Sequence, residues 1–225
     1  MGKVFARALA KRGYAIGLHY YSSEEQAQAT AEEFRQEGVE VLLFRTDLTS
    51  LSEVDELFKE IDESNLSISI LVNSAGVMNR NRVANLDIAE WDKTMSLNLR
   101  APFLLSKKAY SRMKESGLIV NISDAGRNKI WVNYPDYLIS KYALEKLTQI
   151  MAKEFAPKVR VNAIAPGLFL PAKAYPITEW EKLVARTPLK RAVVESEIAS
   201  ALYFLIDNPS IIGQTIVVDG GYSLV

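Results

Sequence analysis

The 225-residue chain has no cysteine and a single histidine, His19. The lack of cysteine excludes disulfides, thiolate catalysis and cysteine-bound metals, and one histidine argues against a histidine-based metal site or a catalytic triad. Basic and acidic residues balance at 27 each, so no net charge favours nucleic acid or an anionic membrane as a partner. No stretch approaches the roughly 20 apolar residues of a membrane helix, and no signal-peptide pattern opens the chain. We therefore expect a cytoplasmic protein that holds no metal.

What the chain does contain is an alternation of short, apolar, β-branched runs with longer helical segments. This alternation predicts an α/β fold of the Rossmann type, a doubly wound parallel sheet with helices on both faces, in one domain over residues 1–225. The expected strands are 14–20, 39–45, 68–72, 118–122, 159–164 and 215–218. The expected helices are 3–12, 23–37, 51–63, 88–115, 136–155 and 195–206.

The front of this pattern is incomplete. A dinucleotide-binding fold starts with a strand that leads through a glycine-rich turn into the first helix, whereas this chain opens with Met1-Gly2-Lys3 and enters a helical segment at once. Because the first strand lies in the middle of the sheet, its absence predicts two facing sheet edges. We expect that the stated sequence starts about a dozen residues late; the alternative is a truncated protein that binds nucleotide poorly. An intact mass equal to that of residues 1–225 would contradict the late start.

Tyr137 and Lys141 form a Tyr-x-x-x-Lys pair within the segment YLISK. Residues four apart share a helix face, so a phenol and an ammonium lie together there, and a nearby cation favours the phenolate. A tyrosine ordinarily titrates near ~10, so the pairing predicts a lowered pKa and a general acid that works at neutral pH. The same spacing is also common on the surfaces of amphipathic helices.

Further motifs accompany this pair in chain order: Asn73-Ser74-Ala75-Gly76, Asn98 and Pro166-Gly167. Together they resemble the active site of the short-chain dehydrogenase/reductase family, and the resemblance extends from Gly2 to Gly221. It implies a nicotinamide-dependent reductase of a small-molecule substrate in which Tyr137 protonates the substrate. Lys141 would lower the tyrosine pKa and bind the nicotinamide ribose, and Asn98 would hold a water in a proton relay.

The resemblance also implies the residues that bind the cofactor. Gly2 matches the last glycine of the family's glycine-rich turn, and Asp47-Leu48 match the position that contacts adenine. Small residues after the strand 68–72 let the backbone approach the cofactor closely. The remaining implied contacts are Asn73, Ala75, Gly76, Tyr137, Lys141, Pro166 and Gly167.

The choice of cofactor follows from a missing acid. NAD-specific folds place an Asp or Glu near the end of the second strand of the complete fold, and this chain has His19-Tyr20-Tyr21-Ser22-Ser23 there. The serines precede a helix whose N-terminal amides favour an anion such as a 2′-phosphate, although they can also be helix caps. We predict NADPH, with His19, Tyr21 and Ser22 among its contacts.

Asp124 departs from the common family pattern, in which a serine lies 13 residues before the tyrosine. An Asp here resembles the pteridine-reductase branch. An ionised carboxylate cannot donate to a ketone oxygen, but a partly buried carboxylic acid with a raised pKa can protonate the nitrogen of a ring C=N. The alternative is that the neighbouring Ser123 does the usual work and Asp124 is a loop residue.

The substrate side leaves two readings open. Pteridine reductases commonly carry an aromatic residue after the Asn-x-Ala segment, but this chain has Val77-Met78, closer to the 3-oxoacyl carrier-protein reductases. Trp131 or Tyr134 could supply a substitute stacking face or could be ordinary packing. The two readings are therefore a pteridine-like reductase and a reductase of 3-oxoacyl thioesters or small ketones. An alternative of a different class is a non-catalytic binding protein that keeps the fold but has lost the glycine-rich turn.

Two further segments carry expectations. Residues 167–191 correspond to the family's substrate loop and its small helix, and the aromatic residues in it predict a lid that is less ordered without ligand, namely Phe169, Tyr175 and Trp180. Helix 136–155 is apolar on more than one face, so one face is expected to pack on the sheet and the other on a partner. The family's usual assembly implies a homotetramer or homodimer through 88–115 and 136–155.

Overall fold

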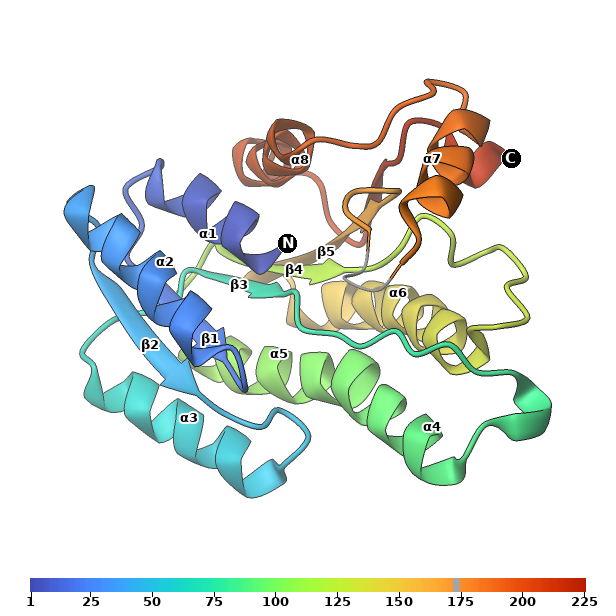
Figure 1. Ribbon diagram of the computed structural model, residues 1–225. Coiled ribbons are helices and arrows are strands. Elements are labelled where there is room, and N and C mark those ends of the chain that lie inside the picture. The colour runs from blue at the N-terminus through green and yellow to red at the C-terminus, as the bar shows by residue number, and fades with distance from the viewer. Residues whose placement is uncertain (172–174) are drawn as a thin grey trace.

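The strands run parallel to one another and lie between two layers of helices (Figure 1). The computed structural model describes residues 1–171 and 175–225. The strands are β1 (Ile16–Tyr20), β2 (Val41–Arg45), β3 (Ile70–Asn73), β4 (Gly117–Ile122), β5 (Val159–Pro166) and β6 (Thr215–Val218). The α-helices are α1 (Gly2–Ala10), α2 (Glu24–Gln36), α3 (Leu51–Glu63), α4 (Ile88–Met95), α5 (Ala101–Arg112), α6 (Pro135–Phe155), α7 (Ile177–Arg186) and α8 (Glu195–Asp207). Shorter turns are the 3₁₀ segments η1 (Val83–Asn85) and η3 (Tyr222–Leu224) and the π-helical segment η2 (Ser96–Arg100).

The expected strands and fold class are confirmed, but the strands form two sheets. β1 pairs with β2, and β3-β4-β5-β6 form the second sheet in that order. The facing edges, β1 and β3, flank a cavity of about 660 Å³ that is lined mainly by apolar side chains, including Phe5, Leu18, Phe44 and Leu71. The two facing edges that the sequence predicts are therefore present.

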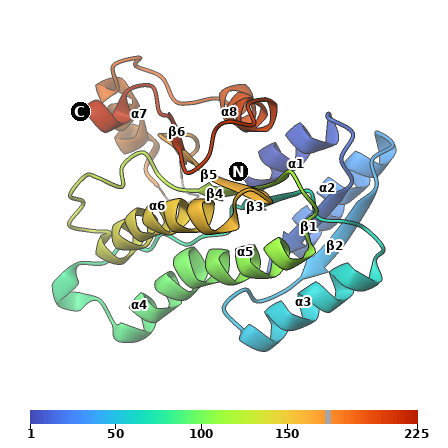
Figure 2. The ribbon, with the colours of Figure 1, turned by 180° about the vertical axis from the view of Figure 1, so that it is seen from behind.

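Helices cover both faces of the sheets (Figures 1 and 2). On one face α1 and α8 pack on β4 and β5 through a buried cluster that includes Phe5, Val120, Ile164 and Leu202. On the other face α3, α5 and α6 enclose a second cluster around Phe58, Ile119, Met151 and Val161. The alternation of Ile119 and Val120 between these clusters is the two-residue period of a strand buried on both faces.

The single helix expected at 88–115 is interrupted. It consists of α4, the π-helical segment η2 and α5, and α5 ends at Arg112. The wider turn lies around Asn98, whose side chain bonds to the backbone of Val77 rather than facing solvent. A periodicity argument cannot detect such a turn, because it depends on a partner distant in sequence.

Two further points concern the helices. The small helix expected in the substrate loop is present as α7. The expected disorder of that loop falls partly on residues 172–174, which lie outside the described residues. Within residues 1–171 and 175–225, no helix has both the length and the apolar character needed to cross a membrane.

Candidate active site

The predicted catalytic residues converge where β4 ends and α6 begins. Tyr137 lies in the first turn of α6, and its Oη donates a 2.6 Å hydrogen bond to Asp124 Oδ2. The backbone N–H of Gly126 donates to the other carboxyl oxygen at 2.6 Å. Ser123 is buried, and its hydroxyl has no hydrogen-bond partner within the described part of the chain. The structure therefore brings Asp124, and not Ser123, to the tyrosine.

Lys141 lies one helical turn beyond the tyrosine and is buried. Its Nζ donates to the carbonyl oxygen of Ile122 at 2.7 Å and lies 5.8 Å from the centroid of the Tyr137 ring. Burial lowers the pKa of Lys141 to about 8, and the negative charge of Asp124 partly opposes this shift. The ammonium is therefore held at the end of β4 by a backbone carbonyl.

The predicted lowering of the tyrosine pKa is wrong for this arrangement. The pKa of Tyr137 is raised well above its ordinary value, first by burial and then by the charge and hydrogen bond of Asp124. Burial also raises the pKa of Asp124, against the hydrogen bond from Tyr137 and the charge of Lys141. The carboxyl group is the closer partner of the phenol, and a carboxylate opposes the phenolate instead of favouring it.

Asn98 is fully buried in η2 and connects three segments. Its Oδ1 accepts from Val77 N–H at 2.8 Å, and its Nδ2 donates to Val77 O at 2.9 Å and to Ser140 Oγ at 3.1 Å. Ser140 in turn donates to the carbonyl oxygen of Tyr137 at 2.7 Å. Sequence reasoning missed Ser140, although its place directly before Lys141 in YLISK was a usable signal.

Two glycines leave space that a side chain would fill. A Cβ atom on Gly76 would lie 3.2 Å from Asn98 Oδ1 and 3.6 Å from Lys141 Nζ, so the backbone there borders the catalytic groups directly. A Cβ atom on Gly167 would lie 2.7 Å from the Cα of Asp219, which requires glycine where β5 leaves the sheet. Both positions lie at the carboxyl ends of strands, where doubly wound sheets bind ligands.

Three residues predicted to contact the cofactor instead form side-chain hydrogen bonds with other residues of the protein. Asn73 is buried and donates to Ser106 Oγ and to Asn121 Oδ1. Asp47 accepts two bonds from Thr49, which hold its carboxyl pKa below the usual range. The Nε2 of His19 donates to the carbonyl oxygen of Thr46 at 2.8 Å, and burial lowers the pKa of this imidazole. Any cofactor contact from these three residues would therefore come mainly from their backbone.

The other predicted cofactor residues lie around the same edge. Leu48 is buried in the cluster beneath α3 and α5, whereas Tyr21 and Ser22 are exposed after β1. Gly2 starts α1, and a Cβ there would lie 3.9 Å from Ser74 Oγ. Pro166 ends β5, and Ala75 follows β3 in a partly exposed position.

Aromatic residues gather beside Asp124. Trp131 packs over Gly126, where a Cβ would lie 2.1 Å from the indole, and it contacts Tyr134 edge-on with a centroid separation of 6.1 Å. Sequence reasoning missed Tyr222 in η3, whose ring centroid lies 6.1 Å from that of Trp131. Burial and the charge of Asp124 raise the pKa of Tyr222 to about 12. Phe169, a predicted substrate residue, instead packs against the core cluster beneath α1 and α8.

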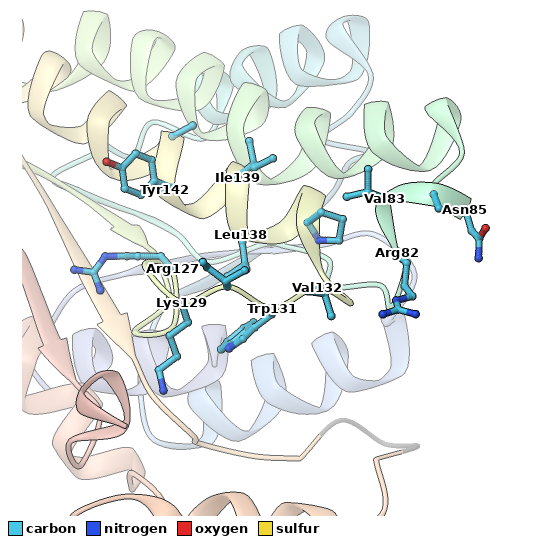
Figure 3. Close-up of a pocket in the computed structure, with 14 residues that line it drawn as sticks. Arg82, Val83, Asn85, Arg127, Lys129, Trp131, Val132, Leu138, Ile139 and Tyr142 are labelled. Carbon is cyan, nitrogen blue, oxygen red and sulfur yellow. The ribbon is translucent and has the colours of Figure 1, made fainter.

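A cavity of about 750 Å³ lies on the outer side of this aromatic group, between the loop 127–135, η1 and the amino-terminal half of α6 (Figure 3). Its lining includes Arg82, Trp131, Ile139 and Tyr142. Among the described residues, the lining contains none of the catalytic candidates Asp124, Tyr137 and Lys141. This cavity therefore lies beside the catalytic groups and does not contain them.

Comparison with known proteins finds relatives over nearly the whole chain. The family model described as enoyl-(acyl carrier protein) reductase matches residues 1–223. The 3-oxoacyl-[acyl-carrier-protein] reductase FabG of Staphylococcus epidermidis is 30% identical and aligns over 98% of this chain and 93% of its own length. The corresponding enzyme of Synechocystis is 31% identical over 98% of this chain and 92% of its own. Among solved structures, FolM alternative dihydrofolate reductase 1 from Brucella canis, complexed with NADP, superposes with a TM-score of 0.94 and 32% identity over 99% of this chain and 89% of its own.

The chain therefore belongs to the short-chain dehydrogenase/reductase family and is an oxidoreductase. The roles of its individual site residues are predictions from geometry and resemblance.

Replacing Tyr137 with phenylalanine removes the hydroxyl that meets Asp124 and keeps the buried ring. We expect turnover to fall by at least ~100-fold, because the variant loses the hydroxyl that donates to Asp124, with the Kd for the cofactor nearly unchanged. Lys141→Ala is expected to lower turnover and weaken cofactor binding together. Steady-state kinetics and cofactor titration measure both effects, and near-full activity in either variant would refute the catalytic assignment.

Proposed function

We propose that this protein is an NADPH-dependent reductase of a C=N bond in a pteridine-like ring. The observation that carries the proposal is the hydrogen bond between Tyr137 Oη and Asp124 Oδ2, because it puts a carboxyl group where a carbonyl reductase of this family has a serine hydroxyl. The aromatic residues beside Asp124 support a flat ring as the ligand. The fold match to a protein named as an alternative dihydrofolate reductase points to the same chemistry.

The carboxyl group suits protonation of nitrogen. Reduction of C=N adds a hydride to carbon and a proton to nitrogen, and burial raises the pKa of Asp124 so that its carboxylic acid form persists to a higher pH. After the proton leaves, Tyr137 Oη and the N–H of Gly126 donate to the two oxygens of the resulting carboxylate. These donors stabilise the conjugate base, which makes proton transfer more favourable.

The residues present fit a nicotinamide cofactor at its reactive end, where bound NADPH would supply the hydride. Gly76 provides the close backbone approach beside Lys141 and Asn98, and Gly167 borders the same edge from β5. The residues that follow β1, which would face the 2′-phosphate of bound NADPH, contain no acid until Glu24. The sheet register puts Arg45, an exposed basic residue, directly beside Tyr20. The NADP and NADPH complexes among the structural neighbours support the same cofactor.

A clear preference for NADPH over NADH in kcat/KM is expected. The cause is that the carboxyl end of β1 offers hydroxyl groups and a nearby guanidinium, but no carboxylate to bind the free ribose hydroxyls. Arg45→Ala should reduce the preference by weakening NADPH alone. Initial rates with each cofactor measure the ratio, and a preference for NADH in the unmodified protein would overturn the assignment.

The second candidate function is reduction of a 3-oxoacyl thioester. It is supported by the relatives named 3-oxoacyl-[acyl-carrier-protein] reductase and by Val77-Met78, which supply no aromatic ring after the Asn-x-Ala segment. Oxidation of NADPH with dihydrobiopterin, folate and an acetoacetyl thioester in parallel compares the candidates directly.

Asp124→Ser separates these two functions. With serine, only a weak acid faces the substrate, so reduction of dihydrobiopterin should fall by at least ~100-fold, whereas reduction of the thioester should persist or rise. The unmodified enzyme needs protonated Asp124, so its activity should be present below the raised pKa of that carboxyl and lost as pH rises through it. The serine variant should lack this descending limb. Intact pterin reduction by Asp124→Ser would eliminate the pteridine reading.

We further propose that the outer face of α6 and α5 joins copies of the chain into a homodimer or homotetramer. These two helices carry four large apolar side chains that solvent reaches: Phe103, Ile139, Tyr142 and Ile150. Ile139 and Tyr142 also line the cavity of Figure 3. An exposed apolar surface of this kind on a folded protein is typical of an interface.

Introducing charge tests this surface. Ile139→Glu combined with Tyr142→Glu should shift the mass in sedimentation velocity toward the monomer, because carboxylates cannot be buried unpaired between copies. Leu51→Glu, an exposed apolar position at the start of α3, is the matched control and should not change the mass. A monomeric unmodified protein would refute the proposal outright.

A further inference from the structure

A buried carboxyl group lies directly before the catalytic tyrosine. Asp136 has no exposed surface, and neither has Thr94 near the end of α4. Thr94 Oγ1 donates to Asp136 Oδ2 at 2.6 Å, while Asp136 Oδ1 has no hydrogen-bond partner within the described residues. Burying a carboxyl group with so few partners costs free energy. A native protein that retains such a group usually has a structural or functional use for it. Within the described residues, neither the Asp136 nor the Thr94 side chain forms a hydrogen bond with Asp124, Tyr137 or Lys141.

This bond is one of two that join the same pair of segments. Asn98 Nδ2 donates to Ser140 Oγ at 3.1 Å, so α6 is bonded to the α4–η2 segment twice. Thr94 and Asn98 are four residues apart along that segment, and Asp136 and Ser140 are four apart along α6. Tyr137 lies between the two bonded positions of α6. The start of α6 is therefore held at both ends of its first turn.

We propose that Asp136 is a positioning residue, which together with Thr94 fixes the first turn of α6 so that Tyr137 Oη reaches Asp124. The first turn of a helix lacks part of the internal hydrogen bonding and opens more readily than the middle. The 2.6 Å contact with Asp124 depends on the placement of that turn. A displacement of ~1 Å at a reacting group can reduce turnover by about 100-fold. The kinetic consequence rests on the proposed function, whereas the structural consequence does not.

Asp136 could instead serve only to stabilise α6, without positioning Tyr137. A negative charge near a helix N-terminus stabilises the helix by itself, through the backbone N–H groups there. In that case, loss of the Thr94 bond would lower the melting temperature but would leave turnover in the folded protein unchanged.

The test compares Thr94→Val, which keeps the shape and removes the donor, with Thr94→Ser, which keeps the donor. Thr94→Val should lower kcat at least ~10-fold with the Kd for NADPH within about threefold, and Thr94→Ser should restore most of the turnover. Thr30→Val is the matched control, since Thr30 is a buried threonine of α2 whose hydroxyl bonds only within its own helix. Its kcat should stay at the unmodified value.

A double variant separates placement from stability. Thr94→Val with Asp136→Leu replaces both polar partners with apolar groups of similar shape, so the protein should keep its melting temperature. We expect its kcat to stay low, because the directional bond is gone. Full turnover in Thr94→Val, or recovery of turnover in the double variant, would overturn the proposal.

A spectroscopic measurement tests the placement without any substrate. The ¹³Cζ resonance of Tyr137, identified by its loss in Tyr137→Phe, should shift or broaden in Thr94→Val and stay in place in Thr30→Val. An unmoved resonance in Thr94→Val would overturn the proposal even if activity had fallen. If the unmodified protein reduces no substrate but the resonance moves, the proposed function fails and the positioning role stands.

Discussion

The hydrogen bond between Tyr137 and Asp124 is the interaction on which the site depends. It connects the first turn of α6 to the end of β4 and brings two acids of very different strength into contact inside the protein. Burial and then the neighbouring carboxyl group raise the pKa of Tyr137. Burial also raises the pKa of Asp124, and the hydrogen bond from Tyr137 only partly opposes that rise. The pair therefore holds its protons tightly, and Lys141 is the nearby cation that reduces this cost for the carboxylate.

Several buried polar bonds keep that contact in place. Lys141 is tied to the carbonyl oxygen of Ile122, and Asn98 bridges the Val77 backbone and Ser140. Each bond connects two segments that are distant in sequence. The side chains of Lys141, Asn98 and Ser140 are buried, where an unpaired polar atom is costly. The geometry at the end of β4 is thus a property of the assembled helices and not of any single loop.

The relatives point to two different reactions, and overall similarity does not choose between them. The chain is about as similar to proteins named 3-oxoacyl-[acyl-carrier-protein] reductase as to one named alternative dihydrofolate reductase. Overall similarity reports the shared fold, which serves either reaction. The difference between the reactions lies at a few atoms, and at this position the chain has a carboxyl group with a raised pKa, flanked by Trp131 and Tyr222.

The sequence by itself determined the order of strands and helices along the chain, the α/β class and the motif residues. Burial on both faces of a sheet and turn chemistry leave local patterns that the sequence shows directly. The structure confirmed the proximity of Asp124, Tyr137 and Lys141, which follows from a strand end and a helix spacing. It reversed the expected pKa of Tyr137, since that depends on which charged group is nearest in space. The π-helical turn at Asn98, the inward side chain of Asn73 and the packing of Phe169 into the core are likewise decided by partners far away in sequence. Local spacing indicates which face a residue occupies, but only tertiary packing decides what that face meets.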